Sequence, residues 1–252
     1  MTVIAFTRPE RRLRESISAA EAAGFVVMAA PSLEIIPRDI RDTERLLKTI
    51  RPDDIIIFTS VTAAEECGRS PFFKDSVADS KIISIGPGTS EALKRFGVSA
   101  DIVPPVYSSE GIVEHMRGMS AVKRVVLIRS DHGSPALDQG LREMGAEVVD
   151  FTAYSLKPAD PKHLDAILDA GKQGKIDVFA FTSPLSARSF IEAAENKGMD
   201  AGDMFNKKIV AAIGGPTSDM LASFGVRVDV MPEKATFDNM LSEIKKKIEM
   251  KN

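Results

Sequence analysis

Short runs of apolar, largely β-branched residues alternate along the chain with longer segments in which apolar residues recur at helical spacing. This alternation predicts a parallel sheet covered by helices, and therefore the α/β class. The expected strands lie near 2–7, 25–29, 54–58, 81–85, 101–103, 124–129, 146–151, 177–181, 208–213 and 227–230. Helices are expected to fill the intervals between the strands, for example near 10–23, 62–67, 89–96, 109–117, 134–144, 186–197, 216–224 and 236–249.

The second half of this pattern repeats the first half in the same order. Three landmarks recur 121 positions later: Arg8 as Arg129, Gly24 as Gly145, and Pro37 as Pro158. The tripeptide Phe-Thr-Ser at 58–60 returns at 181–183, each time at the end of an apolar run. Three landmarks in one register seldom arise by chance, so the sequence predicts two related α/β units.

The composition is that of a globular protein with room for two domains. Of the 252 residues, 44% are hydrophobic and 27% are charged, with both signs interspersed. Domains of about 100 to 150 residues are the commonest. The net charge of -3 supplies no basic stripe for a phosphate backbone, so we expect no nucleic-acid partner. A small anion remains compatible, because helix N-termini and single arginines can hold it locally.

The apolar runs are too short to cross a membrane. The runs at 54–58 and 178–181 have the length of strands, whereas a membrane span needs about 20 apolar residues. The first residues carry neither the basic prelude nor the apolar stretch of a signal peptide, and Cys67 is the only cysteine. We therefore expect a cytoplasmic, reducing setting without membrane contact.

No residues stand at the spacing of a metal site or of a cofactor motif. His115, His132 and His163 lie in different segments, and one cysteine cannot build a thiolate site. The sequence has no Walker loop and no G-x-S-x-G elbow, and Glu91 occupies the place of the third glycine in G-x-G-x-x-G. We expect no metal and no cofactor, and a chemistry that depends on hydroxyl groups, backbone N–H groups and arginines.

The repeated motifs fall at the carboxyl ends of the expected strands, where open α/β sheets bind their ligands. Ser60 and Ser183 can cap the following helix or donate a hydrogen bond to a ligand, and a plain cap would need no further explanation. Gly86 and Gly214 lie in tight turns whose backbone N–H groups suit a carboxylate or a phosphate. A turn that merely needs glycine explains these two positions equally well.

Two arginines and two tyrosines complete the candidate site. Arg8 and Arg129 end the first strand of each copy, where guanidinium groups can hold carboxylates bidentately. The alternative is an arginine that is simply solvated. Tyr154 lies in a linker-like segment and Tyr107 precedes a polar turn, and either ring could serve packing alone.

Taken together, these motifs resemble the uroporphyrinogen-III synthase family. The motifs follow one another in the family's order: Thr7-Arg8-Pro9, 54–60, Ile85-Gly86-Pro87, Tyr107-Ser108-Ser109-Glu110-Gly111, Tyr154, Phe181-Thr182-Ser183-Pro184 and 212–217. The resemblance covers nearly the whole chain, and it rests on order and spacing because each motif alone is weak. Gly88 and Gly215 depart from the family pattern, and each could alter its turn without removing the donors.

The resemblance implies two flavodoxin-like, doubly wound parallel-sheet domains joined by a two-stranded linker. Segments 31–38 and 153–160 occupy equivalent places in the repeat and would form that linker. One domain would then comprise 1–36 with 159–252, and the other 37–158. A polar cleft between the domains would hold the substrate, with Tyr154 facing it.

The resemblance also implies a lyase that acts as a cytoplasmic monomer without a cofactor. Such an enzyme cyclises hydroxymethylbilane, a linear tetrapyrrole with acetate and propionate groups, to uroporphyrinogen III for haem biosynthesis. Water is lost and the D ring is inverted. The implied catalytic residue is Tyr154, which would assist the departure of the hydroxyl group or position the reacting ring. The expected substrate contacts are Arg8, Ser60, Gly86, Ser108, Ser109, Arg129, Ser183, Gly214 and Thr217.

Two alternatives without this chemistry stay open from the residues alone. A two-lobed binding protein also closes paired α/β domains over a small anion, although the expected absence of a signal peptide argues against a periplasmic version. A nucleotide-sugar transferase can also have two α/β domains, but no phosphate motif supports it. Only the synthase predicts that a linear tetrapyrrole is turned over.

Overall fold

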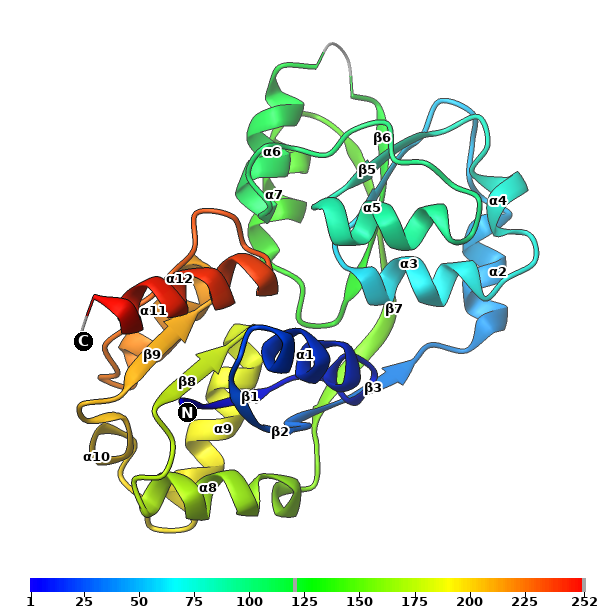
Figure 1. The fold of residues 1–252 in the computed structure, drawn as a ribbon. Helices are drawn as coiled ribbons and strands as arrows, with labels where there is room; N and C mark the ends of the chain where they lie inside the picture. The colour runs from blue at the N-terminus through cyan, green and yellow to red at the C-terminus, as the bar shows by residue number, and fades with distance from the viewer. Residues whose placement is uncertain (120–121, 251–252) are drawn as a thin grey trace. The chain divides into compact units, whose positions relative to one another are not determined.

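The computed structural model describes residues 1–119 and 122–250, which form two compact units (Figure 1). The first unit comprises Met1–Glu34 with Lys157–Asn252, and the second comprises Ile35–Leu156. The chain therefore passes between the units twice, once within strand β3 (Leu33–Pro37) and once within strand β7 (Glu147–Pro158).

The first unit contains a parallel sheet with the strand order β2-β1-β8-β9. Its strands are β1 (Val3–Thr7), β2 (Val26–Ala30), β8 (Val178–Phe181) and β9 (Ile209–Ala212). Val230 adds a parallel bridge to Ala211, beyond β9. The order reverses at β1, as it does in doubly wound flavodoxin-like sheets.

Helices cover both faces of the first sheet. They are α1 (Glu10–Ala22), η1 (Pro161–Leu164), α8 (Asp165–Lys172), α9 (Pro184–Asn196), α10 (Ala201–Phe205), α11 (Gly215–Ser223) and α12 (Phe237–Glu249). Neighbouring residues of one strand enter different cores: Ile4 and Phe6 pack with α1 and α12, whereas Ala5 packs with α8 and α9. Burial on both faces explains why these strands are continuous apolar runs.

The second unit repeats this arrangement with the order β3-β7-β6-β4-β5. Its remaining strands are β4 (Ile55–Phe58), β5 (Lys81–Ser84) and β6 (Arg124–Ser130), and its helices are α2 (Ile40–Leu47), α3 (Val61–Gly68), α4 (Phe73–Ser76), α5 (Pro87–Lys94), α6 (Ser109–Arg117) and α7 (Pro135–Glu143). Strands β7, β6, β4 and β5 are parallel, and Ile102 adds a bridge to Ile83 beyond β5. This order reproduces that of the first unit once the repeat is taken into account.

Strand β3 runs antiparallel to β7. The Arg38 N–H donates to the Ala153 carbonyl at 3.0 Å, and the Ala159 N–H donates to the Ser32 carbonyl at 3.0 Å. Because the residue numbers of these two pairs run in opposite directions, the strands do too. The two crossing segments are thus hydrogen-bonded to each other.

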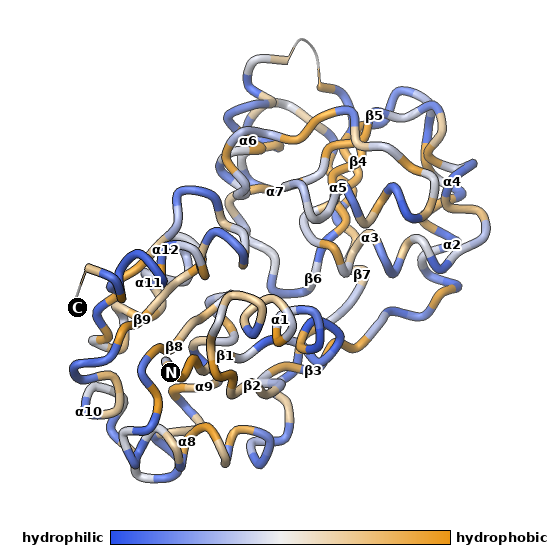
Figure 2. The backbone as a smooth tube through the Cα atoms, viewed as in Figure 1, coloured by the Kyte–Doolittle hydropathy of each residue, from blue (hydrophilic) through white to orange (hydrophobic). Residues whose placement is uncertain are grey.

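The predicted α/β class is confirmed, and the interior of each unit is built from the predicted apolar runs (Figure 2). Gly24 and Gly145 hold φ values of 87° and 85° after α1 and α7, the left-handed conformation expected of a glycine C-cap. Helices α2, α4, α8 and α10 and the short η1 lie in intervals where helices were expected without stated bounds. The strand expected at 146–151 extends to Pro158, because its second half pairs with β3.

Candidate functional site

Both units present equivalent hydroxyl groups at the carboxyl ends of their strands. The Ser60 Oγ accepts a hydrogen bond from the Ala63 N–H at 3.0 Å and caps α3. The Ser183 Oγ accepts from the Ser186 N–H at 3.1 Å and caps α9. The capping interpretation therefore holds for both serines, and each cap leaves further hydrogen-bonding capacity on the hydroxyl group.

The Tyr154 side chain lies in β7 and reaches the cap of α3. Its hydroxyl group donates to the Ser60 Oγ at 3.0 Å, while its ring packs with Phe58 and Ile128 in the core of the second unit. Only 7% of Tyr154 is exposed. We expected this side chain to face a polar cleft, so its burial is a correction. The cause is the strand itself, because the segment taken for a linker continues β7 across a register shift opposite Arg129 and Ser130.

The environment of the Tyr154 phenol favours its protonated form. Burial raises the pKa of Tyr154, and hydrogen bonds with Ser60, Ser130 and Thr62 offset only part of that effect. A phenol with a raised pKa stays protonated at neutral pH and releases its proton less readily than a tyrosine in water. The group is thus suited to donating a hydrogen bond rather than to transferring a proton.

The loops that follow β5 meet at Gly86 and Tyr107. Gly86 precedes α5 in an extended conformation, and a Cβ atom placed on it would lie 3.3 Å from the Tyr107 ring. Ser108 caps α6 by accepting from the Gly111 N–H at 3.1 Å, and Ser109 is the first residue of that helix. The N-termini of α5 and α6 therefore both open at this end of the second sheet.

The equivalent turn of the first unit is less crowded. Gly214 precedes α11, and the nearest neighbour of a Cβ atom placed there would be the Ala235 methyl group at 3.8 Å. The Thr217 N–H donates to the Gly214 carbonyl at 3.1 Å, and Thr217 is only 2% exposed. The predicted substrate contact at Thr217 is thus a buried residue in the first turn of α11.

Arg8 folds back onto its own unit. Its guanidinium group lies 5.0 Å from the centre of the Phe237 ring and donates to the Ser16 Oγ at 2.6 Å. Burial, together with the charge of Arg12, lowers the pKa of Arg8 to about 10. Among the described residues, the buried Arg8 Nε has no hydrogen-bond partner. Because this donor is buried, the contact between Arg8 and a substrate carboxylate stays a prediction.

Arg129 differs from Arg8 because its charge is already compensated. Its Nε and one terminal nitrogen donate to the Asp150 carboxylate at 2.9 and 2.6 Å, and the other terminal nitrogen donates to the Ser134 carbonyl at 2.6 Å. The Arg129 side chain is 12% exposed. This arrangement does not favour the predicted carboxylate contact, since Asp150 on the adjacent strand already occupies the guanidinium fork.

The turn after β6 contains two residues that the sequence did not single out. The Asp131 carboxylate accepts from the Leu156 N–H at 3.0 Å and contacts the His132 Nδ1 at 2.8 Å. Their position in the sequence could have indicated them, because both residues directly follow a strand that ends at the candidate site.

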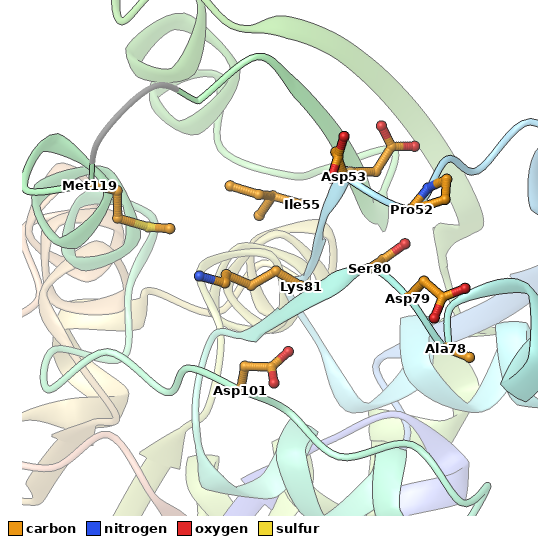
Figure 3. Close-up of a pocket in the computed structure, with 10 residues that line it drawn as sticks. Pro52, Asp53, Ile55, Ala78, Asp79, Ser80, Lys81, Asp101 and Met119 are labelled. Atoms are coloured by element: carbon orange, nitrogen blue, oxygen red, sulfur yellow. The ribbon is translucent and has the colours of Figure 1, made fainter.

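A surface cavity of about 440 Å³ lies at the opposite, amino end of the second sheet (Figure 3). Its lining includes the starts of β4 and β5 and the carboxylates of Asp53, Asp79 and Asp101, with Lys81 as its single basic residue. Such a lining repels a polycarboxylate. The cavity is therefore not the binding site that the strand ends predict.

No group of three or more His, Cys, Asp or Glu side chains in the described ranges could hold a metal ion. Within those ranges, no helix is both long and apolar enough to cross a membrane.

Comparison with known proteins places the chain in one family. The family model described as uroporphyrinogen-III synthase HemD matches residues 15–242. A protein of Methanothermobacter thermautotrophicus, provisionally named as such a synthase, is 31% identical over 96% of both chains. The uroporphyrinogen-III synthase of Synechococcus elongatus is 30% identical over 88% of this chain and 86% of its own.

Solved structures confirm the predicted two-domain α/β fold. A triple variant of uroporphyrinogen III synthase from Thermus thermophilus has a TM-score of 0.69 and 21% identity, with coverage of 99% of this chain and 100% of that chain. The Helicobacter pylori enzyme, titled a uroporphyrinogen-III synthetase, has a TM-score of 0.59 and 17% identity, covering 98% and 100%. Because the family model spans most of the sequence, the chain belongs to the uroporphyrinogen-III synthase family.

Proposed function

We propose that this protein cyclises hydroxymethylbilane to uroporphyrinogen III, with loss of water and inversion of the D ring. The reaction is that of a lyase in tetrapyrrole biosynthesis, carried out without a cofactor by a cytoplasmic monomer. The observation that carries the proposal is the Tyr154–Ser60 hydrogen bond at the strand ends of a chain from this family.

The reaction begins with the departure of the terminal hydroxyl group as water. The pyrrole nitrogen supplies the electron pair, which leaves an electrophilic azafulvene. The substituted α-carbon of the last ring then attacks the azafulvene to give a spiro intermediate. The bond from this carbon to its original methylene bridge breaks, which leaves a second azafulvene, and the free α-carbon of the same ring bonds to that methylene, so the ring is inverted. No electrons are exchanged with another molecule, so the protein needs only to bind, orient and move protons.

In this mechanism Tyr154 positions the reacting end of the substrate. Its phenol stays protonated because burial raises its pKa, and its one O–H hydrogen is donated to the Ser60 Oγ, so the Ser60 hydroxyl hydrogen is the donor left for the substrate. Ser60 holds that hydroxyl group in place while its own position is fixed by the cap of α3. Because these hydrogen bonds fix the hydroxyl groups before the substrate binds, less entropy is lost when the reactive geometry is reached.

The carboxylates of the substrate would be bound by helix N-termini. Helices α5 and α6 begin at Gly86 and Ser108 in the second unit, and α9 and α11 begin at Ser183 and Gly214 in the first. The first N–H groups of a helix have no partner within the helix, and its dipole favours an anion there. A substrate with many carboxylates can use both of the helix ends that one unit presents.

The decisive experiment measures which isomer is formed. By the family resemblance, hydroxymethylbilane closes without help to the type I isomer, in which the last ring keeps its orientation. We expect the purified protein to yield the type III isomer without added metal, nucleotide or flavin, as separated by chromatography of the oxidised products. Formation of the type I isomer alone by folded protein would refute the proposal, as would the binding without turnover that a non-catalytic binding protein predicts.

A further inference from the structure

The turn that follows β6 is connected to Tyr154 through three contacts. Ser130 pairs with Tyr154 across the register shift, and its hydroxyl group shares a hydrogen bond with the Tyr154 phenol. The Asp131 N–H donates to the Tyr154 carbonyl at 3.3 Å. The His132 N–H donates to the Ser130 Oγ at 3.3 Å. Residues 130–132 are thus fixed to the part of β7 that carries Tyr154.

Within this turn, Asp131 orients the imidazole ring of His132. The Asp131 Oδ1 accepts from the Leu156 N–H at 3.0 Å and contacts the His132 Nδ1 at 2.8 Å. Burial alone would raise the pKa of Asp131, but hydrogen bonds from His132, Leu156 and Ser155 together lower it. Asp131 is therefore a carboxylate, so Nδ1 carries the proton and Nε2 is directed to other partners. The His132 side chain is 48% exposed, which leaves it accessible to a ligand.

The proposed reaction requires a proton that Tyr154 is poorly suited to give. A hydroxide ion is a poor leaving group, so the departing oxygen must be protonated as its C–O bond breaks. The raised pKa of the Tyr154 phenol makes it a weaker acid than an ordinary tyrosine. Imidazole is the side chain that most often serves as a general acid in proteins, and the Nδ1 of His132 lies 2.8 Å from the Asp131 carboxylate.

We propose that His132 donates the proton to the leaving hydroxyl group, with Asp131 as its positioning residue and the Tyr154–Ser60 pair positioning the substrate. This inference rests on the proposed function. The observation that supports it is that hydrogen bonds tie Ser130, Asp131 and His132 to one another and to the part of β7 that contains Tyr154.

His132 gives up one proton and regains one proton in each turnover. The imidazolium N–H bond breaks and its proton passes to the hydroxymethyl oxygen, the C–O bond breaks, and water leaves. After ring closure, the tetrahedral ring carbon loses its proton as the pyrrole becomes aromatic again. Neutral His132 is then the acceptor that regains a proton, so the products are uroporphyrinogen III and one water molecule.

This turn has other ionisable groups in it or next to it. Arg129 immediately precedes the turn, but the Asp150 carboxylate compensates its charge. Tyr154 stays protonated, and Asp131 stays ionised. A pH-dependent change of rate that disappears in a His132 variant would consequently report His132 rather than these groups.

The test compares His132→Gln with His163→Gln, which removes an exposed histidine from η1 in the first unit. Loss of a general acid typically costs on the order of 10²-fold or more, so we expect a fall of that size in kcat, with little change in KM, for His132→Gln only. The wild-type rate should decline as pH rises through one ionisation, and His132→Gln should lack this decline. Asp131→Asn should lower kcat with little change in KM, because the imidazole ring loses the carboxylate that orients it.

The outcomes separate this inference from the proposed function. If the wild-type protein forms no type III isomer, the proposed function fails. If it forms the isomer while folded His132→Gln keeps the wild-type kcat and pH profile, His132 is not the donor and the inference is overturned. A fall in kcat with an unchanged pH profile would likewise overturn it, because a purely structural role would produce that result.

Discussion

The Tyr154 hydroxyl group donates to the Ser60 Oγ at 3.0 Å, joining strand β7 to the first turn of helix α3. The serine accepts from the tyrosine and from the Ala63 N–H at the same time. A helix cap, which alone would be structural, thereby fixes the position of a phenol at the strand ends.

If this hydrogen bond positions Tyr154, removing either partner should have nearly the same effect on catalysis. We expect Tyr154→Phe and Ser60→Ala each to lower kcat/KM roughly tenfold, which corresponds to about 1 kcal/mol. The double variant should lose little more than either single variant, because both changes break one interaction. Steady-state rates of the four proteins measure this directly, and fully additive losses would contradict the coupling.

The same variants separate capping from positioning. Ser60→Ala should also lower the free energy of unfolding by about 1 kcal/mol, because the α3 cap is lost. Ser183→Ala removes the equivalent cap of α9. In the repeat, the position equivalent to Tyr154 is Leu33, which has no hydroxyl group to donate to Ser183. The unfolding free energy of Ser183→Ala therefore calibrates the cap alone, as measured by urea denaturation.

Much of the fold could be predicted from the sequence because strands buried on both faces must be apolar along their whole length. The site was less predictable, for reasons that are visible in particular residues. The partner of Arg129 is Asp150, 21 positions away on the next strand, and only the strand register brings the two together. Tyr154 was assigned to a linker because its segment precedes Pro158, and the pairing of that linker with 31–38 was expected, but the sequence did not show that the ring would be buried beside Phe58.

The compensated charge of Arg129 predicts a structural role for this residue. We expect Arg129→Met to lower the free energy of unfolding by about 1 to 2 kcal/mol, a range that allows for solvent screening at the partly exposed Asp150. The KM for hydroxymethylbilane should stay within about threefold of wild type, since no donor is withdrawn from the substrate. Asp150→Asn should reproduce the loss of stability. A KM that rises more than tenfold with unchanged stability would assign Arg129 to the substrate instead.

Cys67, the single cysteine, offers a chemical probe of unfolding. Its buried thiol also predicts how the stability of the native state changes with pH. Burial raises the pKa of the Cys67 thiol to about 12, with a smaller contribution from Glu66. The native state therefore keeps this proton where an unfolded cysteine, with a pKa of about 8.5, has lost it. The stabilisation is complete below the unfolded pKa and declines as pH rises toward 12. Alkylation by iodoacetamide at pH 8 should be slow in native protein and rapid in urea, and rapid labelling of the native form would contradict the burial.

Gly86 and Gly214 stand at equivalent positions, at the starts of α5 and α11, yet we expect an added methyl group to lower the unfolding free energy only at Gly86. Both are extended, with φ of −172° at Gly86 and −175° at Gly214, so alanine introduces no backbone strain at either position. At Gly86 the new Cβ atom would lie 3.3 Å from the Tyr107 ring, closer than ordinary van der Waals contact, whereas at Gly214 it would lie 3.8 Å from Ala235.

Gly86→Ala must therefore move Tyr107 or the first turn of α5, and we expect a loss of about 1 kcal/mol in the free energy of unfolding. Because the same turn presents the α5 N–H groups proposed to bind a carboxylate, the KM for hydroxymethylbilane should rise as well. Gly214→Ala is the matched control for stability, and its unfolding free energy should stay within about 0.5 kcal/mol of wild type. Urea denaturation and initial rates of both variants provide the comparison. Equal responses at the two positions would show that the contact with Tyr107 does not constrain the turn.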